Sequence, residues 1–168
     1  MANIFPYKAL YYDNETFKDL TPLVIPPYDN IPAGEEQKYL SRSPYNFAHV
    51  LLPRTVDEDY SHAAELINQW KDQHILKETS VPCYYLYQQS FEAYGQKHVR
   101  HTLMCSVELQ PFSEGIVRPH ENTYGQYKAD RLQILRKTQC NLSHVFGMVN
   151  DEEGFLEDRK STRLNSSH

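Results

Sequence analysis

The sequence predicts an α+β fold in which a mixed or antiparallel sheet, built around a central β-hairpin, packs against two or three helices. Residues 83–91 and 99–109 alternate apolar and polar side chains on either side of Tyr94-Gly95, as half-buried antiparallel strands do. Residues 60–74 and 127–138 instead place their apolar side chains at helical spacing. Two different periodicities in one short chain therefore indicate both kinds of secondary structure.

Both longer helices are expected to bury one apolar side. Thr55 and Glu58 form the S/T-x-x-E pattern of a capping box, which predicts the start of the helix at 60–74. A turn containing Gly125 precedes the second helix, at 127–138. The side chains expected to point inward are Ile67, Trp70, Leu132 and Leu135.

Prolines divide the first part of the chain into short segments, because proline ends helices and removes a backbone donor. Residues 23–25 are expected to form a short buried strand that runs directly into Pro26-Pro27-Tyr28-Asp29. Residues 35–41 predict a short helix that ends at Ser43-Pro44. Residues 46–52 and 144–149 are apolar runs that predict further strands.

Residues 158–168 (DRKSTRLNSSH) match the in-frame translation of a common sequencing-library adapter, and such a tail is excluded from fold reasoning. We therefore expect this tail to be an artefact without ordered structure. Residues 1–157 are then expected to be the N-terminal part of a longer protein, with its C-terminal half missing.

Composition limits the classes of function. Residues 158–168 carry three basic residues and one acidic residue, so without them the net charge falls from −5 to −7. An acidic domain without a Lys/Arg cluster is a poor match to a nucleic-acid backbone, so nucleic acid is not expected as a partner. The sequence has no secretory signal, no apolar run long enough to span a membrane and no CxxC pair, which predicts a cytoplasmic protein that does not bind membranes.

Chemically reactive side chains concentrate in the segment from His120 to Arg131. Lys128 and Arg131 stand at the start of the predicted helix, where free N–H groups and a partial positive charge favour a phosphate or carboxylate. Glu121 could serve as a base or cation ligand, and His120 as an acid or orienting group. The alternative is that Asp130 and Arg131 form an ordinary surface ion pair and His120 packs in a turn.

A second candidate is Asp29, which the two prolines before Tyr28 would present rigidly at the end of a strand. The alternative is a turn in which Asp29 caps the backbone. No metal-binding motif accompanies these residues, because Tyr124 stands where an HExxH motif requires a second histidine. The chain likewise has no P-loop, GxSxG or GxGxxG pattern, so no protein metal site is predicted.

Seven segments and Trp70 stand in a specific order and spacing along the chain. The segments are PYKAL (6–10), VIPPYD (24–29), SPYN (43–46), YLYQQSF (85–91), PHENT (119–123), KADRL (128–132) and NLSHVFG (141–147). Together they resemble a widespread prokaryotic family known as domain of unknown function 1015 (DUF1015). Asn30 and His144 depart from the valine and proline that the family usually has at these positions.

The family is similar to the ParB/sulfiredoxin superfamily, of which one branch phosphorylates free serine with ADP. The resemblance implies a nucleotide-dependent phosphotransferase that uses ADP or ATP with Mg²⁺ and acts on a small metabolite. Glu121 would activate the acceptor hydroxyl with His120 beside it, and Asp29 would help to hold metal or substrate. The residues implied in binding phosphate or substrate are Tyr28, Lys128, Asp130, Arg131 and Asn141.

Family members typically carry a DGHHR-like phosphate-binding segment in their later half, and this sequence has none. The expected truncation accounts for its absence. Two other functions stay open: a ParB-like protein associated with nucleic acid, and a nucleotide-binding domain without catalysis. The first predicts salt-dependent DNA binding, and the second predicts saturable ligand binding without a product.

Overall fold

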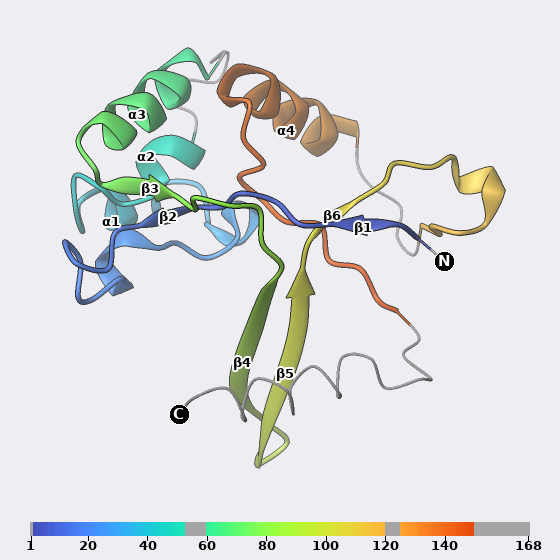
Figure 1. The fold of residues 1–168 in the computed structure, drawn as a ribbon. Coiled ribbons are helices and arrows are strands. Elements are labelled where there is room, and N and C mark those ends of the chain that lie inside the picture. Colours follow the sequence, from blue (N-terminus) through green and yellow to red (C-terminus); the bar gives the residue numbers. More distant parts are fainter. Residues whose placement is uncertain (1, 53–59, 120–124, 150–168) are drawn as a thin grey trace. The chain divides into compact units, whose positions relative to one another are not determined.

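A computed structural model describes residues 2–52, 60–119 and 125–149 (Figure 1). It is an α+β structure whose sheets are small and antiparallel, which confirms the predicted class. The helices are α1 (Glu36–Leu40), α2 (Ala48–Leu51), α3 (Ser61–Asp72) and α4 (Gly125–Thr138), with 3₁₀ turns η1 (Thr21–Leu23), η2 (Tyr28–Asn30) and η3 (Phe112–Glu114). The strands are β1 (Ile4–Phe5), β2 (Leu10–Tyr12), β3 (Leu76–Glu78), β4 (Tyr85–Ala93), β5 (Gln96–Met104) and β6 (Ser106–Val107).

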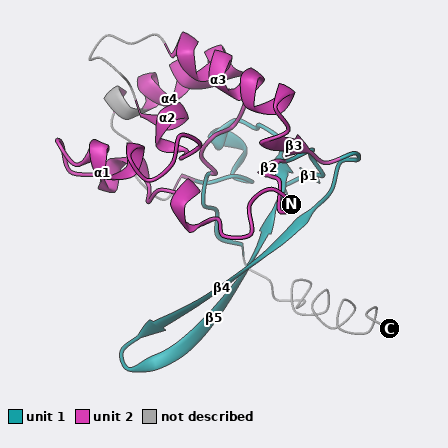
Figure 2. Ribbon diagram, turned by 90° about the vertical axis from the view of Figure 1, so that its left-hand side faces the viewer, with its two compact units in different colours: residues 1–9, 80–118, 145–168 teal, residues 10–79, 119–144 magenta. Residues whose placement is uncertain are grey.

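The chain forms two compact units, which Figure 2 distinguishes by colour. Unit 1 comprises residues 1–9, 80–118 and 145–168, and unit 2 comprises residues 10–79 and 119–144. None of the helices in the described part of the chain has the length and hydrophobicity that crossing a membrane requires.

Unit 2 contains the hydrophobic core. Helix α3 buries Ile67 and Trp70, as the sequence predicts, and both side chains are at most 3% exposed. Strands β2 and β3 pair antiparallel beside them. The Trp70 ring lies 6.2 Å from that of Tyr12 and 6.0 Å from that of Tyr45, so aromatic contacts join the β2 strand to α3.

Within residues 46–52, helix α2 (Ala48–Leu51) forms in place of the predicted strand. Asn46 explains the difference, because its side-chain oxygen accepts a hydrogen bond from the Ala48 N–H at 2.9 Å and so begins a helical turn. Residues 23–25 also form no strand: Leu23 ends the η1 turn, and Val24 after it is exposed. Short apolar runs fit either periodicity, so the sequence of such a run does not decide between a strand and a helix.

Helices α1 and α4 confirm the helices predicted at 35–41 and 127–138, but the inward side of α4 differs from the prediction. Leu132 and Leu135 are 44% and 37% exposed, whereas Ile134 is 3% exposed. Among the positions of this helix whose burial the structure describes, the better-buried ones are Asp130, Arg131, Ile134 and Thr138. These positions follow the helical repeat of three or four residues, so polar side chains occupy part of the inward stripe.

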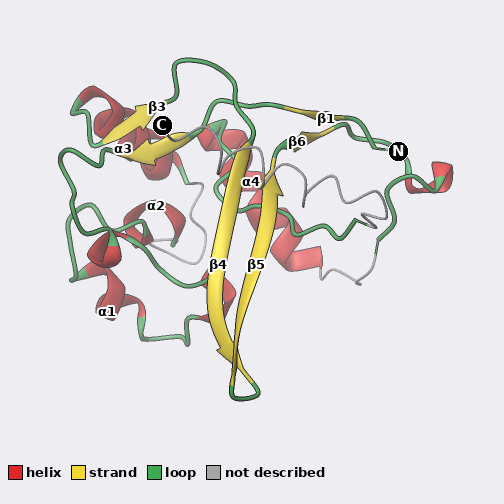
Figure 3. Ribbon diagram, turned by 60° about the horizontal axis from the view of Figure 1, so that its bottom comes forward, coloured by secondary structure: helices red, strands yellow, loops and turns green. Residues whose placement is uncertain are grey.

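Unit 1 is built around the β4–β5 hairpin, whose long antiparallel strands confirm the predicted hairpin (Figure 3). Tyr94 and Gly95 both adopt positive φ, 52° and 72°, as a two-residue hairpin turn requires. No described residue of unit 1 is fully buried, and Tyr87, Phe91 and Val99 are largely exposed. The strand predicted at 144–149 is wrong, because these residues form no regular structure.

Candidate functional site

The segment that carries Tyr28 and Asp29 is held by backbone hydrogen bonds. Pro27 fixes the entry to η2, and the N–H of Asn30 donates to the Pro27 carbonyl at 2.9 Å. Tyr28 is half-buried against the core, whereas Asp29 beside it is exposed. The prolines therefore position Tyr28 toward the interior of unit 2 and leave Asp29 at the surface.

Arg131 of α4 lies over the Tyr28 ring. Its guanidinium carbon is 3.7 Å from the ring centroid, which is the stacked arrangement that a planar cation adopts on an aromatic face. The contact joins two segments that are about 100 residues apart in the chain, and both belong to unit 2. Sequence reasoning assigned both residues to binding, and the structure brings them together.

The carboxylate of Asp130 holds the same guanidinium from another direction. Arg131 Nε donates to Asp130 Oδ2 at 2.9 Å, and Arg131 Nη2 donates to that oxygen as well. The ion pair is partly buried, with the two side chains 21% and 32% exposed. Asp130 and Arg131 thus form the ion pair that the alternative describes. They do not form it on an ordinary surface, because both residues lie on the inward stripe of α4.

Tyr60 completes this group, which we call the Arg131 cluster: Tyr28, Tyr60, Asp130 and Arg131. The Tyr60 hydroxyl donates to Asp130 Oδ1 at 2.6 Å and accepts a hydrogen bond from Arg131 Nη2 at 3.5 Å. The sequence pattern placed Tyr60 only at the start of the helix predicted at 60–74. No local pattern could have found its polar role, because its partner stands 70 residues further along the chain.

One donor of the cluster is unused. Arg131 Nη1 is buried and has no hydrogen-bond partner among the described residues. A buried polar atom without a partner costs free energy, so it indicates either a strained site or a missing ligand. Guanidinium N–H groups match the oxygens of phosphate and carboxylate, which makes Nη1 a candidate contact for an anion.

The other predicted site residues lie apart from this cluster or outside the described residues. Lys128 is exposed on α4, and Asn141 is exposed after that helix. His120 and Glu121 lie outside the described residues, as does the capping box of Thr55 and Glu58. Among the described residues, no three His, Cys, Asp or Glu side chains come together as metal ligands would.

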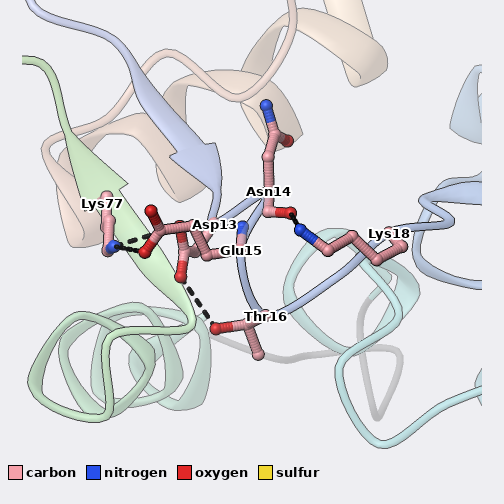
Figure 4. A network of polar contacts seen from close by, with 6 residues as sticks. All are labelled: Asp13, Asn14, Glu15, Thr16, Lys18 and Lys77. Carbon is pink, nitrogen blue, oxygen red and sulfur yellow. Dashed lines mark hydrogen bonds and ion pairs between the residues drawn. The ribbon is translucent and has the colours of Figure 1, made fainter.

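A second polar network surrounds Asp13, which is 6% exposed, at the end of β2 (Figure 4). Asp13 accepts hydrogen bonds from the Thr16 hydroxyl at 2.8 Å and from the Glu15 N–H at 3.3 Å, and it pairs with Lys77 of β3 at 3.0 Å. The bond from Thr16, followed by that from Lys77, lowers the pKa of Asp13 to about 2. Its bonds join the loop after β2 to β3, so we assign this network to structure.

A protein-family model described as "Protein of unknown function (DUF1015)" matches residues 4–164. The chain belongs to the DUF1015 family. No curated protein and no solved structure matches the chain.

Proposed function

We propose that this DUF1015 protein binds a phosphate group of a nucleotide through the Arg131 cluster. We further propose that it is the N-terminal part of a phosphotransferase that acts on a small metabolite, resembling the enzymes that phosphorylate free serine. The observation that carries the binding proposal is the buried, unpartnered Nη1 of Arg131. The resemblance to the ParB/sulfiredoxin superfamily supports the transfer reaction.

The surroundings of Arg131 fit a phosphate site. Asp130 and Tyr28 hold the guanidinium before any ligand arrives, so little side-chain freedom is lost on binding. Lys128, three residues before Arg131 on the same helix, would supply a second positive charge, and Asn141 a further polar contact. Phosphoryl transfer depends mainly on positioning and on neutralising charge, which is the chemistry that such residues provide.

The remaining roles follow the resemblance. Glu121 would take the proton of the acceptor hydroxyl while the oxygen of that hydroxyl bonds to the transferred phosphorus. The nucleotide would leave with the electrons of the broken P–O bond. His120 would act as an acid or would orient the reacting groups, and Asp29 would contact the substrate or the metal. Mg²⁺, when bound with ADP or ATP, would neutralise phosphate charge. The described residues gather no carboxylate set around the cluster, so its ligands would come largely from the nucleotide phosphates and water.

Titration calorimetry with ADP and Mg²⁺ tests the binding. Arg131→Met should weaken ADP binding about tenfold or more, since it removes a charged hydrogen-bond donor. Arg136→Met is the matched control, because Arg136 is an exposed arginine on the same helix and should leave binding unchanged. Equal affinities in the wild type and Arg131→Met would remove the cluster as the phosphate site.

Turnover must be measured on the protein encoded by the complete reading frame. Sequencing the template past codon 157 would establish that reading frame. Loss of phosphorylated product in Glu121→Gln would support Glu121 as the base, and unchanged turnover would exclude it. ADP binding without any product would favour a non-catalytic nucleotide-binding domain. That second candidate agrees with one observation, namely that both oxygens of Asp130 already accept hydrogen bonds.

We also propose that polypeptide following residue 157 in the complete protein covers the hairpin of unit 1. The structure supports this: among the described residues, 16 of the 21 exposed large apolar side chains belong to unit 1, and none of its described side chains is buried. A two-stranded hairpin is only marginally stable without further strands or a packed helix. Faster tryptic cleavage at Lys97 and Arg100 in this chain than in the complete protein is the expected result, and equal rates would contradict the proposal.

A further inference from the structure

We infer that Tyr60 is a positioning residue of the anion site: its hydroxyl, which donates to Asp130 and accepts from Arg131 Nη2, sets the orientation of the Arg131 guanidinium. The inference rests on the proposed binding of a nucleotide phosphate at Arg131. It adds a residue to which neither the sequence motifs nor the family resemblance assigns a role. Three observations carry it, namely the backbone of Tyr60, the hydrogen bonds of Asp130 and the free edge of Arg131.

The backbone of Tyr60 is unusual for a tyrosine. Its φ and ψ are 59° and 19°, in the left-handed region that a residue with a β-carbon adopts only at a cost. The position is the N-cap of α3, yet no side-chain hydrogen bond caps the helix there. Asparagine or glycine would suit this backbone better, so what tyrosine provides at this position is its buried ring and its hydroxyl.

The hydrogen bonds of Asp130 are divided between its two oxygens. Oδ1 accepts from the Tyr60 hydroxyl, and Oδ2 accepts from Nε and Nη2 of Arg131. Because each oxygen has its own donor, the carboxylate cannot rotate without losing one of them. Tyr60 therefore holds the carboxylate in the orientation that receives the guanidinium on a single oxygen.

This arrangement determines which part of Arg131 remains for a ligand. The Nε and Nη2 edge is bound to Asp130, and one face of the guanidinium lies on Tyr28. Nη1, the remaining nitrogen, is the buried atom without a partner. A phosphate oxygen that approaches Nη1 thus meets a donor fixed by two residues, one of which Tyr60 orients. Without the Tyr60 hydroxyl, the Asp130–Arg131 ion pair would persist, but the orientation of the guanidinium would be less defined.

The test is a double-mutant cycle on ADP binding in the presence of Mg²⁺, with Tyr60→Phe and Arg131→Lys made singly and together. Tyr60→Phe keeps the ring and should raise the Kd about fivefold, the value of one hydrogen bond. In the Arg131→Lys background, where no guanidinium is left to orient, the same substitution should change the Kd less than about twofold. A purely structural role for Tyr60 would give the same factor in both backgrounds and would overturn the inference.

Tyr12→Phe is the matched control. Tyr12 is a partly buried tyrosine of unit 2, and its hydroxyl donates to the Tyr45 carbonyl at 2.8 Å and not to the Arg131 cluster. This variant should leave the Kd within about twofold of the wild type, although it also loses one hydrogen bond. A Kd raised as much as in Tyr60→Phe would show a general effect of the lost hydroxyl and would overturn the inference.

The outcomes separate the inference from the function on which it rests. If the wild type binds ADP and Arg131→Lys weakens binding while Tyr60→Phe does not, only the role of Tyr60 is wrong. If the wild type shows no saturable ADP binding, the proposed function is wrong and the inference falls with it. Should Tyr60→Phe fail to fold, Asp130→Asn supplies the second variant, because it weakens the same link to Arg131. An unchanged ADP affinity in Asp130→Asn would contradict the inference.

Discussion

Replacing Asn46 should destabilise unit 2 more than any exposed asparagine replacement. The Asn46 side chain is fully buried, and its Nδ2 donates to the Pro22 carbonyl at 2.7 Å and to the Val24 carbonyl at 3.4 Å. Its Oδ1 accepts from the Ala48 N–H and starts α2. One amide thus joins the start of a helix to the segment that leads into the Pro26-Pro27-Tyr28 turn.

The size of the effect follows from these bonds. Asn46→Ala removes a helix cap, which costs about 1 kcal/mol. It also leaves the strongly bonded Pro22 carbonyl without its donor, and an unsatisfied buried group costs about 1–3 kcal/mol. We therefore expect the free energy of unfolding to fall by about 2–4 kcal/mol, a large part of the roughly 5–15 kcal/mol that holds a typical domain together.

Urea unfolding followed by the fluorescence of Trp70 is the appropriate assay. Trp70 is the single tryptophan of the chain and is buried in the core of unit 2, so the signal reports on the unit that contains Asn46. Asn68→Ala, at an exposed position of α3, is the control and should change stability by less than about 0.5 kcal/mol. A loss in Asn46→Ala no larger than that of the control would refute the reasoning.

Asn46→Asp sharpens the test, because it keeps the capping oxygen but replaces the donor with a second oxygen. A carboxylate facing the Pro22 carbonyl is unfavourable, so its pKa should be raised in the folded state. The variant should therefore be most stable below about pH 4, the pKa of an unfolded aspartate, and should lose stability as the pH rises above that value. A stability difference from the wild type that stays constant with pH would contradict this explanation.

Three further predictions concern other parts of the chain. Because the pKa of Asp13 is lowered from 3.8 to about 2 in the folded state, its stabilising contribution is present above pH 3.8 and is lost as the pH falls toward 2. The acid unfolding curves of the wild type and Asp13→Asn should therefore converge between pH 3.8 and 2, and curves that stay parallel there would contradict a stabilising role for the Asp13 carboxylate. Ile134→Ala should lower the free energy of unfolding by about 2–5 kcal/mol and Leu132→Ala by less than about 1 kcal/mol, since only the first side chain is buried; equal losses in urea unfolding would reverse the assignment of the inward side of α4. In this chain alone, hydrogen exchange followed by mass spectrometry should find the amides of β4 and β5 exchanging at least about 100-fold faster than those of α3, because the hairpin has no buried side chains; protection equal to that of α3 would show that it is covered.

Some residues of the candidate site could be predicted from the sequence, and others could not. Tyr28, Asp130 and Arg131 were selected as reactive types in the matched motifs, and the structure places them in contact. Lys128 and Asn141 lie exposed and outside the cluster. Tyr60 was missed because its hydroxyl acts across a long sequence separation. Residue chemistry is visible in a sequence, but the partner of a buried polar group is decided by packing.

The sequence by itself determined the elements that have strong local signals. The β4–β5 hairpin follows from alternation around a turn with a glycine, and α3 follows from apolar residues at helical spacing that bury Ile67 and Trp70. These signals arise from the backbone periodicity of each element, which needs no knowledge of distant residues. The α+β class followed from the same two periodicities.

Only the tertiary structure decided three other features. Residues 46–52 became a helix because the Asn46 side chain bonded to both the Ala48 N–H and the distant Pro22 carbonyl. The inward side of α4 took Asp130 and Arg131 in place of two leucines, because Tyr60 and Tyr28 offered these polar side chains partners in the interior. Residues 144–149 formed no strand, since an apolar run becomes one only where another strand supplies hydrogen-bond partners. In the first two cases the free energy of a contact between distant segments outweighed the weaker local preference.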